Sequence, residues 1–393
     1  MNEPSVFSGP EITMPKSNLH GSIEHRDLHN IYGMYMHKST YKGLMKRSGD
    51  MERPFILTRA FFAGTQRYGA IWTGDNAAKW EFLEYSVPMC LSVTVGGISF
   101  CGSDVAGFFG DPSVELLVRW YQTGAYTPFF RAHAHIETKR REPWLYGEPY
   151  LSRIRDSIRE RYALLPYWYS LFFQYRNNGV PVMRPMFSVY PQDNQAAALD
   201  RQYHLGPALL VAPIIKSNQD KVDVYIPEGK WYDYHTFATV EIGELKYQTV
   251  ENWIPVFIKG GNIVPRQDRP RRSSQMMIND PYTLVIALDE KEAAEGILYA
   301  DDTHTNLYLK GQFLLGRIEF REKTLVYQVQ SKMSMHNSIE KIIILGLKDK
   351  PKSAIAETEK GSSRVGFYDM GSHIILKLPP VFIDENWTIK LNY

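Results

Sequence analysis

Charged side chains follow three short apolar stretches early in the sequence, and their types suit acid–base chemistry on a polar substrate. Arg59 ends PFILTR, Asp75 ends the turn after AIW, and Asp104 ends the turn after ISFC. Trp72 gives Asp75 an aromatic wall, a surrounding in which proteins place general acids. The guanidinium of Arg59 offers a planar fork of donors to hydroxyls or a carboxylate. Taken singly, Asp75 also suits a turn cap, and Arg59 a structural ion pair.

The sequence RAHAH contains two histidines, His133 and His135, at a spacing that would point both to one side of a strand. Such a pair is compatible with a metal site, but a barrel metallohydrolase takes further ligands from other strands, and the next histidine, His204, lies in a later β-rich region. We therefore favour a substrate-binding imidazole and expect no metal. Phe108, one loop after Asp104, would supply an apolar face.

Short strands and helices alternate from Ile23 to about Asn178, which predicts parallel strands joined by helical crossovers. Strands are expected at 54–58, 70–72, 98–101 and 127–132, and helices at about 28–44, up to 91, at 114–124 and at 150–178. The last helix is expected to kink at Pro166. Chemistry in such folds takes place at the carboxyl ends of the strands, where the candidate side chains stand.

After Gly179 the pattern changes to strands separated by turns, so the predicted fold class is α/β plus all-β. We expect the C-terminal half of a (β/α)8 TIM barrel over residues 1–179, followed by two β-sandwich domains, a proximal one over 180–265 and a distal one over 266–393. The basic stretch RQDRPRRSS at 266–274 is interpreted as a hinge, and a solvated loop is favoured there over an anion site.

The composition excludes several classes of protein. The 393 residues suffice for two or three domains, and 45 basic against 43 acidic residues leave a net charge of +2, so no nucleic-acid partner is expected. No apolar run approaches the roughly 20 residues that cross a bilayer, and the first residues lack a signal-peptide pattern, so no membrane partner is expected. The aromatic share of 13% suits either a carbohydrate-facing pocket or β-rich packing.

Three smaller features leave alternatives open. Cys90 and Cys101 are eleven residues apart, which allows a disulfide or two buried thiols. Asn386 begins the only N-glycosylation sequon, and a chance match is favoured over an occupied site. Asp301 and Asp302 in YADDTHT fit a plain turn better than a calcium site.

Four longer stretches resemble glycoside hydrolase family 31, the retaining α-glucosidases. They are MNEPSVFSGPE, IWTGDN, CGSDVAGFFGDPSVELLVRWYQTGAYTPFFRAHAH and KRREPWLYGE, and the similarity covers essentially the whole chain. Within the family, EHRDLHNIYG and RAFFAGTQRYGAIWTGDN look like the branch that trims glucose from N-linked oligosaccharides in the endoplasmic reticulum.

The resemblance implies a role for each candidate residue. Asp75 would be the general acid/base, which protonates the leaving oxygen and then activates water. The residues that would surround the bound glucose are Arg59, Trp72, Asp104, Phe108 and His133. Cys90 and Cys101 match a bridged pair of the family, which favours a disulfide in an oxidising lumen.

The family pattern places the nucleophilic aspartate immediately before Met1, with Asn2 and Glu3 close behind. A retaining mechanism needs two carboxyl groups about 5 to 5.5 Å apart. The side chain of Glu3 is not expected to reach the anomeric carbon, so these 393 residues are expected to be inactive by themselves.

The resemblance further implies an oligosaccharide substrate with terminal α-linked glucose, no cofactor, and residence in the lumen of the endoplasmic reticulum. The ending IKLNY is not a retention signal, so a non-catalytic β subunit would carry that signal. Two alternatives remain at this point. One is a family member that acts on maltose or glycogen, and the other is a non-catalytic carbohydrate-binding or assembly fragment.

Overall fold

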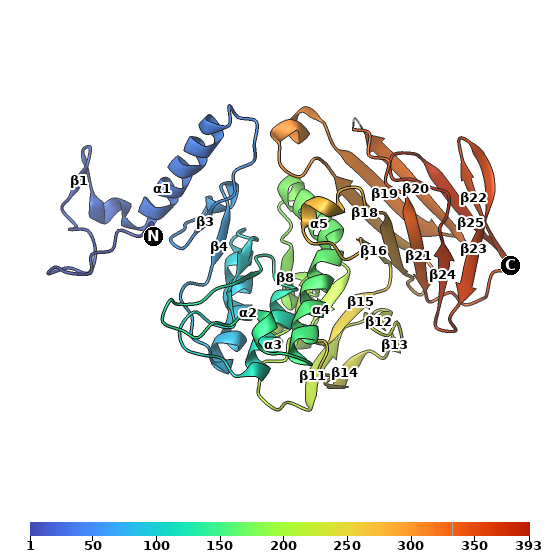
Figure 1. Cartoon of the computed structure of the whole chain (residues 1–393), viewed down its shortest axis with the longest axis horizontal. Coiled ribbons are helices and arrows are strands. Elements are labelled where there is room, and N and C mark those ends of the chain that lie inside the picture. The colour runs from blue at the N-terminus through green and yellow to red at the C-terminus, as the bar shows by residue number, and fades with distance from the viewer. Residues whose placement is uncertain (332) are drawn as a thin grey trace.

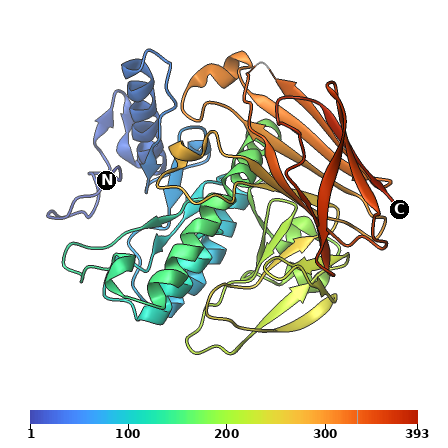
Figure 2. The same cartoon turned by 45° about the vertical axis from the view of Figure 1, so that its right-hand side comes forward.

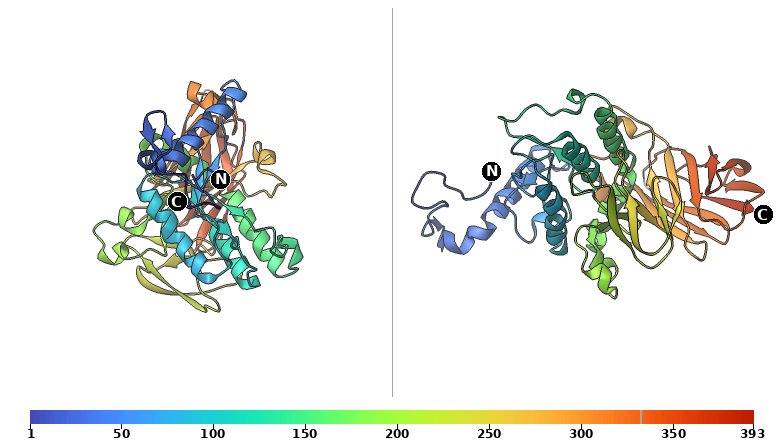
Figure 3. Two further views of the ribbon diagram at one scale, coloured as in Figure 1. Left: turned by 90° about the vertical axis from the view of Figure 1, so that its left-hand side faces the viewer. Right: turned by 90° about the horizontal axis from the view of Figure 1, so that it is seen from below.

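The computed structural model describes residues 1–331 and 333–393, and their arrangement is elongated (Figure 1). The N-terminal helix and loops lie at one end, and the last β-strands and the C-terminus lie at the other (Figure 3). The chain passes in order through a barrel segment (residues 1–178), a proximal β domain (strands β8 to β15) and a distal β domain (strands β16 to β25).

The barrel segment alternates short strands with helices. Its elements are β1 (Leu19–His20), β2 (Ile23–Glu24), α1 (His25–Arg47), β3 (Leu57–Thr58), η1 (Thr65–Arg67), β4 (Ala70–Trp72), α2 (Trp80–Val95), β5 (Cys101–Gly102), β6 (Asp104–Val105), α3 (Val114–Gly124), β7 (Arg131–Ala132), η2 (Pro143–Leu145), α4 (Tyr150–Ala163) and α5 (Leu165–Asn178). The expected strand at 127–132 keeps only its last two residues, because the hydroxyl of Thr127 donates to the carbonyl of Gly124 and holds a turn there.

The strands of the barrel segment pair in parallel, so their carboxyl ends meet at one edge. β4 lies between β3 and β5, with Ile71 opposite both Thr58 and Cys101. β6 pairs with β7, with Asp104 opposite Arg131. This parallel pairing agrees with the predicted α/β class, while the half-barrel itself stays a prediction.

Helices α2, α3 and α4 share one apolar core, which contains the fully buried Leu83, Leu117 and Ile154. The predicted kink at Pro166 is a break between α4 and α5, because proline has no N–H to donate to the preceding turn. Cys90 of α2 and Cys101 of β5 form a disulfide, which confirms the expected pair. Among the described residues, no helix is long and apolar enough to cross a bilayer.

The proximal β domain contains a six-stranded sheet and a separate two-stranded sheet. Its elements are β8 (Met183–Pro185), α6 (Met186–Val189), α7 (Asn194–Ala197), β9 (Tyr203–Leu205), β10 (Leu209–Val211), β11 (Lys221–Ile226), β12 (Trp231–Asp233), β13 (Thr239–Val240), β14 (Gly243–Gln248) and β15 (Val256–Lys259). The sheet order is β13-β12-β15-β10-β9-β8, and β11 pairs with β14. Alternate residues of β11, Val222, Val224 and Ile226, are buried in the core that the sheet shares, as expected for a half-buried strand.

The distal β domain is a ten-stranded sheet that closes on itself. Its elements are β16 (Asn262–Arg266), η3 (Ser274–Met277), β17 (Tyr282–Ala287), β18 (Ala294–Ala300), η4 (Asn306–Lys310), β19 (Leu314–Arg321), β20 (Thr324–Ser331), β21 (Ile339–Leu345), β22 (Ser353–Thr358), β23 (Gly361–Asp369), β24 (His373–Lys377) and β25 (Trp387–Asn392). The predicted β-sandwich is corrected in this respect: β16 pairs with both β17 and β18, which closes the ring of strands. β16 also runs across the expected domain boundary at 265/266.

A buried ion pair joins the barrel segment to the distal domain, and α5 packs along β18 (Figure 2). Asp301, which the sequence placed in a plain turn, is 2% exposed and accepts two hydrogen bonds from Arg53 at 3.1 Å. The hydroxyls of Tyr169 and Tyr299 also donate to it. Asp302 does form the turn, since it accepts hydrogen bonds from the backbone that follows it.

Candidate active site

One side chain, Asn2, ties the N-terminal segment to the end of β3. Its Nδ2 lies 2.5 Å from the hydroxyl of Thr58 and 3.0 Å from the carbonyl oxygens of Gly33 and Ala60. Its Oδ1 accepts a hydrogen bond from the backbone N–H of Ala60 at 3.2 Å. These contacts bring Glu3 beside the loop that carries Arg59.

Arg59 joins two carboxylates at the strand ends. Its Nε donates to Glu3 at 2.6 Å and its Nη1 donates to Asp75 at 3.2 Å. The side chains of Arg59 and Asp75 are 33% and 35% exposed, so both remain open to a ligand. Burial alone would raise the pKa of Glu3, but the hydrogen bond and positive charge of Arg59 outweigh it and hold that pKa below its usual value.

Trp72 forms a wall of the site and lies beneath two cations. Its ring is 5% exposed, and the guanidinium carbons of Arg131 and Arg59 lie 5.3 and 5.9 Å from its centroid. Cations at these distances are attracted to the electron-rich face of an indole. The indole N–H has no hydrogen-bond partner among the described residues. The ring thus links the Arg59 and Arg131 sides of the site.

Asp104 is a fully buried carboxylate at the start of β6. Its Oδ1 accepts a hydrogen bond from Arg131, whereas its Oδ2 has no partner in the part of the chain that the structure describes. Buried polar atoms without a partner are rare in folded proteins and often mark functional sites. Burial raises the pKa of Asp104, and the Arg131 guanidinium opposes part of that rise.

Phe108 and His133 form a stacked pair, with ring centroids 5.1 Å apart. Asn76, the residue after the candidate acid, positions this pair: its Oδ1 accepts from the N–H of Phe108 at 2.9 Å, and its Nδ2 donates to the carbonyl of Asp104 at 3.1 Å. The loop between them turns through Gly107, which has φ +82° and would place a Cβ 2.4 Å from the backbone of the neighbouring loop.

His135 approaches the same phenyl ring edge-on, at 5.3 Å, so both histidines contact Phe108, although β7 ends at Ala132 and neither lies on the strand that the spacing argument assumed. Over residues 1–331 and 333–393, no group of three or more His, Cys, Asp or Glu side chains is arranged to hold a metal ion. A cavity of about 590 Å³ lies on the other side of the Arg59–Glu3 pair, between the N-terminal segment and α1, and Asp75 and Trp72 do not line it.

The structure brings the predicted residues into two connected groups. Arg59, Trp72 and Asp75 form one, while Asp104, Phe108 and His133 form the other. Sequence reasoning missed the residues that connect them, Asn76 and Arg131. Asn76 carried a signal, its place in the polar turn after β4, whereas nothing around Arg131 marked it as the partner of a buried aspartate.

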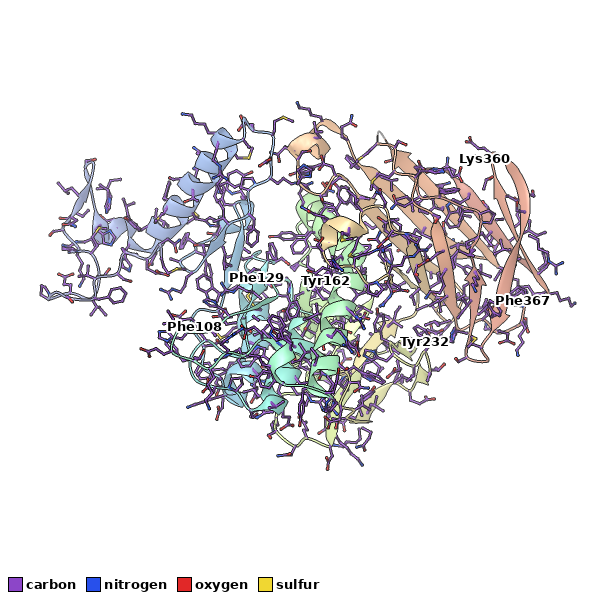
Figure 4. All side chains as sticks on the ribbon, in the orientation of Figure 1. Phe108, Phe129, Tyr162, Tyr232, Lys360 and Phe367 are labelled. Carbon is purple, nitrogen blue, oxygen red and sulfur yellow. A yellow bond between two sulfur atoms is a disulfide. The ribbon has the colours of Figure 1, made fainter. Side chains whose placement is uncertain are left out.

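The site belongs to the barrel segment alone. Phe108 lies among its loops, far from the distal domain that carries Lys360 and Phe367 (Figure 4). The cysteine pair lies buried in the core behind the strands, where it joins α2 to the start of β5.

Comparisons with known proteins match this region closely. Residues 1–171 match the glycosyl hydrolases family 31 TIM-barrel domain, and residues 179–264 match the glycosyl hydrolase family 31 C-terminal domain. Neutral alpha-glucosidase AB of Sus scrofa is 50% identical over 403 aligned residues, which cover 100% of this chain and 42% of that protein. Neutral alpha-glucosidase C of Mus musculus is 46% identical over 402 residues, covering 100% of this chain and 45% of that protein.

A solved structure shows the same arrangement. The catalytic subunit in the crystal structure of an ER glucosidase II heterodimeric complex, which includes the binding domain of a regulatory subunit, superposes with a TM-score of 0.95 and 42% sequence identity. The match covers 100% of this chain and 45% of that one. The present chain therefore spans less than half the length of these relatives.

Proposed function

The chain belongs to glycosyl hydrolase family 31, and on that basis we propose that its barrel segment carries the acid/base half of a retaining α-glucosidase site. The observation that carries the proposal is the Asp75 carboxyl, held half-exposed by Arg59 at the carboxyl end of β4, beside Trp72. A carboxyl in that position can exchange a proton with a ligand while its orientation stays fixed.

In the proposed reaction, Asp75 gives its proton to the oxygen of the leaving group. Once the sugar is attached to the enzyme, Asp75 takes a proton from the attacking water. Arg59 orients the carboxyl through its Nη1, and Glu3 holds the opposite side of the guanidinium through two hydrogen bonds. Glu3 thus acts as a positioning residue, since it fixes the group that fixes Asp75.

The remaining candidates would hold the glucose unit. Trp72 and the stacked pair of Phe108 and His133 offer apolar faces to the sugar ring. The imidazole of His133 and the guanidinium of Arg131, which is 28% exposed and held by Asp104, offer polar groups to its hydroxyls. This division, apolar walls with a few placed polar groups, is the usual make-up of a small-molecule site.

Neither of the other two carboxylates fits the role of nucleophile. Glu3 is engaged by Arg59 through two hydrogen bonds, and Asp104 is fully buried and paired with Arg131. We therefore place the nucleophile outside residues 1–393, and these residues by themselves should bind a glucose analogue without turning over an α-glucoside.

For the whole protein, we propose removal of terminal α-linked glucose from N-linked oligosaccharides in the lumen of the endoplasmic reticulum, with a regulatory subunit as partner and no cofactor. The support is the likeness to neutral alpha-glucosidase AB and to the catalytic subunit of ER glucosidase II. A second candidate is an activity like that of neutral alpha-glucosidase C, whose identity to the chain is nearly as high.

Calorimetric titration of the 393-residue chain with a cationic iminosugar analogue of glucose tests the site. Trp72→Ala should weaken binding roughly tenfold, because the sugar loses its apolar wall. Asp75→Asn should weaken binding of the cationic analogue more than binding of neutral glucose, because the carboxylate is lost. Asp223→Asn, on the exposed face of β11, is the matched control and should change neither affinity.

Three outcomes would contradict the proposal. Unchanged iminosugar binding by Asp75→Asn would remove this residue from the site. Unchanged binding by Trp72→Ala would remove the proposed wall. Steady release of a fluorescent leaving group from an aryl α-glucoside by the purified chain would show that a nucleophile lies within the 393 residues.

A further inference from the structure

A second, arginine-rich groove shares no lining residue with the proposed sugar site. It is a cavity of about 530 Å³ between α4, the turn η2 and the segment 267–272 that leads into the distal domain. The lining residues that the argument uses are Trp144, Arg155, Arg159, Arg269, Arg271 and Arg272. Asp268 is the single acid in the lining, and it is itself paired with Arg266 and Lys341.

The arginine groove is much more basic than the chain as a whole. The net charge over 393 residues is only +2, yet five arginines line one groove. Arg155 and Arg159 stand one helical turn apart on α4, where like charges repel each other. Their side chains are 44% and 53% exposed, so a bound anion could bridge them.

The partners of these arginines differ from one to the next. Arg269 and Arg271 are paired with Glu340 and Asp280, so they form a fixed wall. Arg155 donates through Nη2 to a serine of its own helix and forms a long ion pair, 4.0 Å, with Glu148, and Arg159 lies 3.4 Å from Asp156 on the same helix.

Arg272 is exposed, and no described residue forms an ion pair or hydrogen bond with it. Arg155, Arg159 and Arg272 therefore keep donors available for a ligand, since a guanidinium carries five N–H groups.

Apolar surface accompanies the charge. Trp144 is 63% exposed and its neighbour Leu145 is 49% exposed. Tyr162 on α4, labelled in Figure 4, is 37% exposed and lines the same groove. Exposed tryptophan and arginine together are the residue types that dominate binding energy at protein interfaces.

We propose that the arginine groove binds an acidic segment of a partner protein, with its carboxylates on Arg155, Arg159 and Arg272 and an apolar side chain on Trp144. Guanidinium groups match carboxylates in a two-bond fork, which favours an acidic polypeptide. A free phosphate would leave Trp144 and Leu145 uncovered. A nucleic acid would need a basic track longer than one groove, and the near-zero net charge of the chain does not provide it.

Fluorescence anisotropy with the 393-residue chain tests the proposal. The probe is a labelled short peptide in which glutamates alternate with leucine and phenylalanine, and it is compared with the same peptide carrying glutamine in place of glutamate. Binding should be saturable for the glutamate peptide, should weaken with added salt, and should be at least roughly tenfold weaker for the glutamine peptide.

Charge reversal of two groove residues, Arg155→Glu together with Arg159→Glu, should weaken binding by roughly tenfold or more, and Trp144→Ala should weaken it several-fold. Arg321→Glu is the matched control, since Arg321 is 70% exposed on the distal domain and, among the described residues, forms its ion pair with Glu319 of its own strand. Iminosugar binding should be unchanged in all these variants, which separates this test from that of the sugar site.

The proposal is overturned if the glutamine peptide binds as tightly as the glutamate peptide, or if the charge-reversed variant binds as the parent chain does. Tight binding of a short single-stranded DNA, with none of the acidic peptide, would also overturn it and identify a nucleic-acid site instead. Circular dichroism of each variant shows that a loss of binding is not a loss of fold.

Discussion

The barrel segment and the distal β domain hold their shapes by different means. The parallel strands that end at the proposed sugar site are two or three residues long, whereas the strands of the distal domain run for five to nine residues. Two-residue strands provide few backbone hydrogen bonds, so single side chains such as Asn2, Asn76 and Arg131 fix the site. In the distal domain, the backbone hydrogen bonds between long strands and one continuous apolar core hold the structure in place.

The comparison teaches where each region is vulnerable. A substitution of one polar residue at the sugar site should displace functional groups, because few other contacts hold them. An equivalent substitution in the distal domain should cost the same free energy of unfolding without moving its strands, because the ladders remain. Matched pairs of variants, one from each region, test this difference directly.

The largest expected effect comes from removing the cation beside a buried carboxylate. Arg131→Met would leave Asp104 buried without its partner, and Arg271→Met would do the same to Asp280, which is 4% exposed. Each should lower the free energy of unfolding, because a buried carboxylate loses the cation that compensates its charge. Only Arg131→Met should also abolish iminosugar binding.

Chemical denaturation and calorimetric titration measure the two effects on the same samples. Hydrogen exchange would show whether the loosened segment in each variant is confined to its own region. Comparable loss of sugar binding in both variants would break the comparison, because it would mean that the site depends on the distal domain as strongly as on its own ion pairs.

A second effect concerns acid and the proximal β domain. His204 is fully buried in β9, and burial, together with the positive charges of Lys259 and Arg184, lowers its pKa to about 3. Because the folded protein favours the neutral ring, this contribution to stability is complete above pH 6.5 and is lost as the pH falls from 6.5 towards 3. Between pH 6.5 and pH 4 the loss should be about 3 kcal/mol.

Thermal or urea unfolding as a function of pH measures this loss, and His204→Gln, which does not titrate, should flatten the curve over that interval. Stability of the parent chain that stays constant between pH 6.5 and pH 4 would contradict the prediction. Such a result would show that the proximal domain accommodates a charged ring in β9 without loss of stability.

The sequence predicted the features that depend on local pattern. The helix at 114–124 has the predicted ends because Ser113 caps it and an apolar stripe runs along it. The positions of Asp75 and Asp104 after apolar stretches followed from the same local reasoning. The roles of these two residues came from the family resemblance, and they remain proposals.

Contacts between distant segments were not predictable from the sequence. Arg53 and Asp301 are 248 residues apart, and nothing local to either shows that the other is its partner. Closure of the distal sheet likewise depends on the pairing of β16 with β18, across a turn and another strand. Arg131 was missed for the same reason, because a two-residue strand has no periodic pattern that indicates its neighbour.

The smallest expected effect compares two buried asparagines that tie loops together. Asn76 connects the loops of Phe108 and Asp104, and Asn337 donates to the carbonyls of Ile278 and Asp280. Each change to alanine should lower the free energy of unfolding by about 1–3 kcal/mol, because buried backbone groups lose their partners. With equal costs, only Asn76→Ala should weaken iminosugar binding, since Phe108 and its stacked histidine would shift. Unchanged iminosugar binding by Asn76→Ala would mean that the loop holds its shape without Asn76, and that short strands alone suffice to place the site.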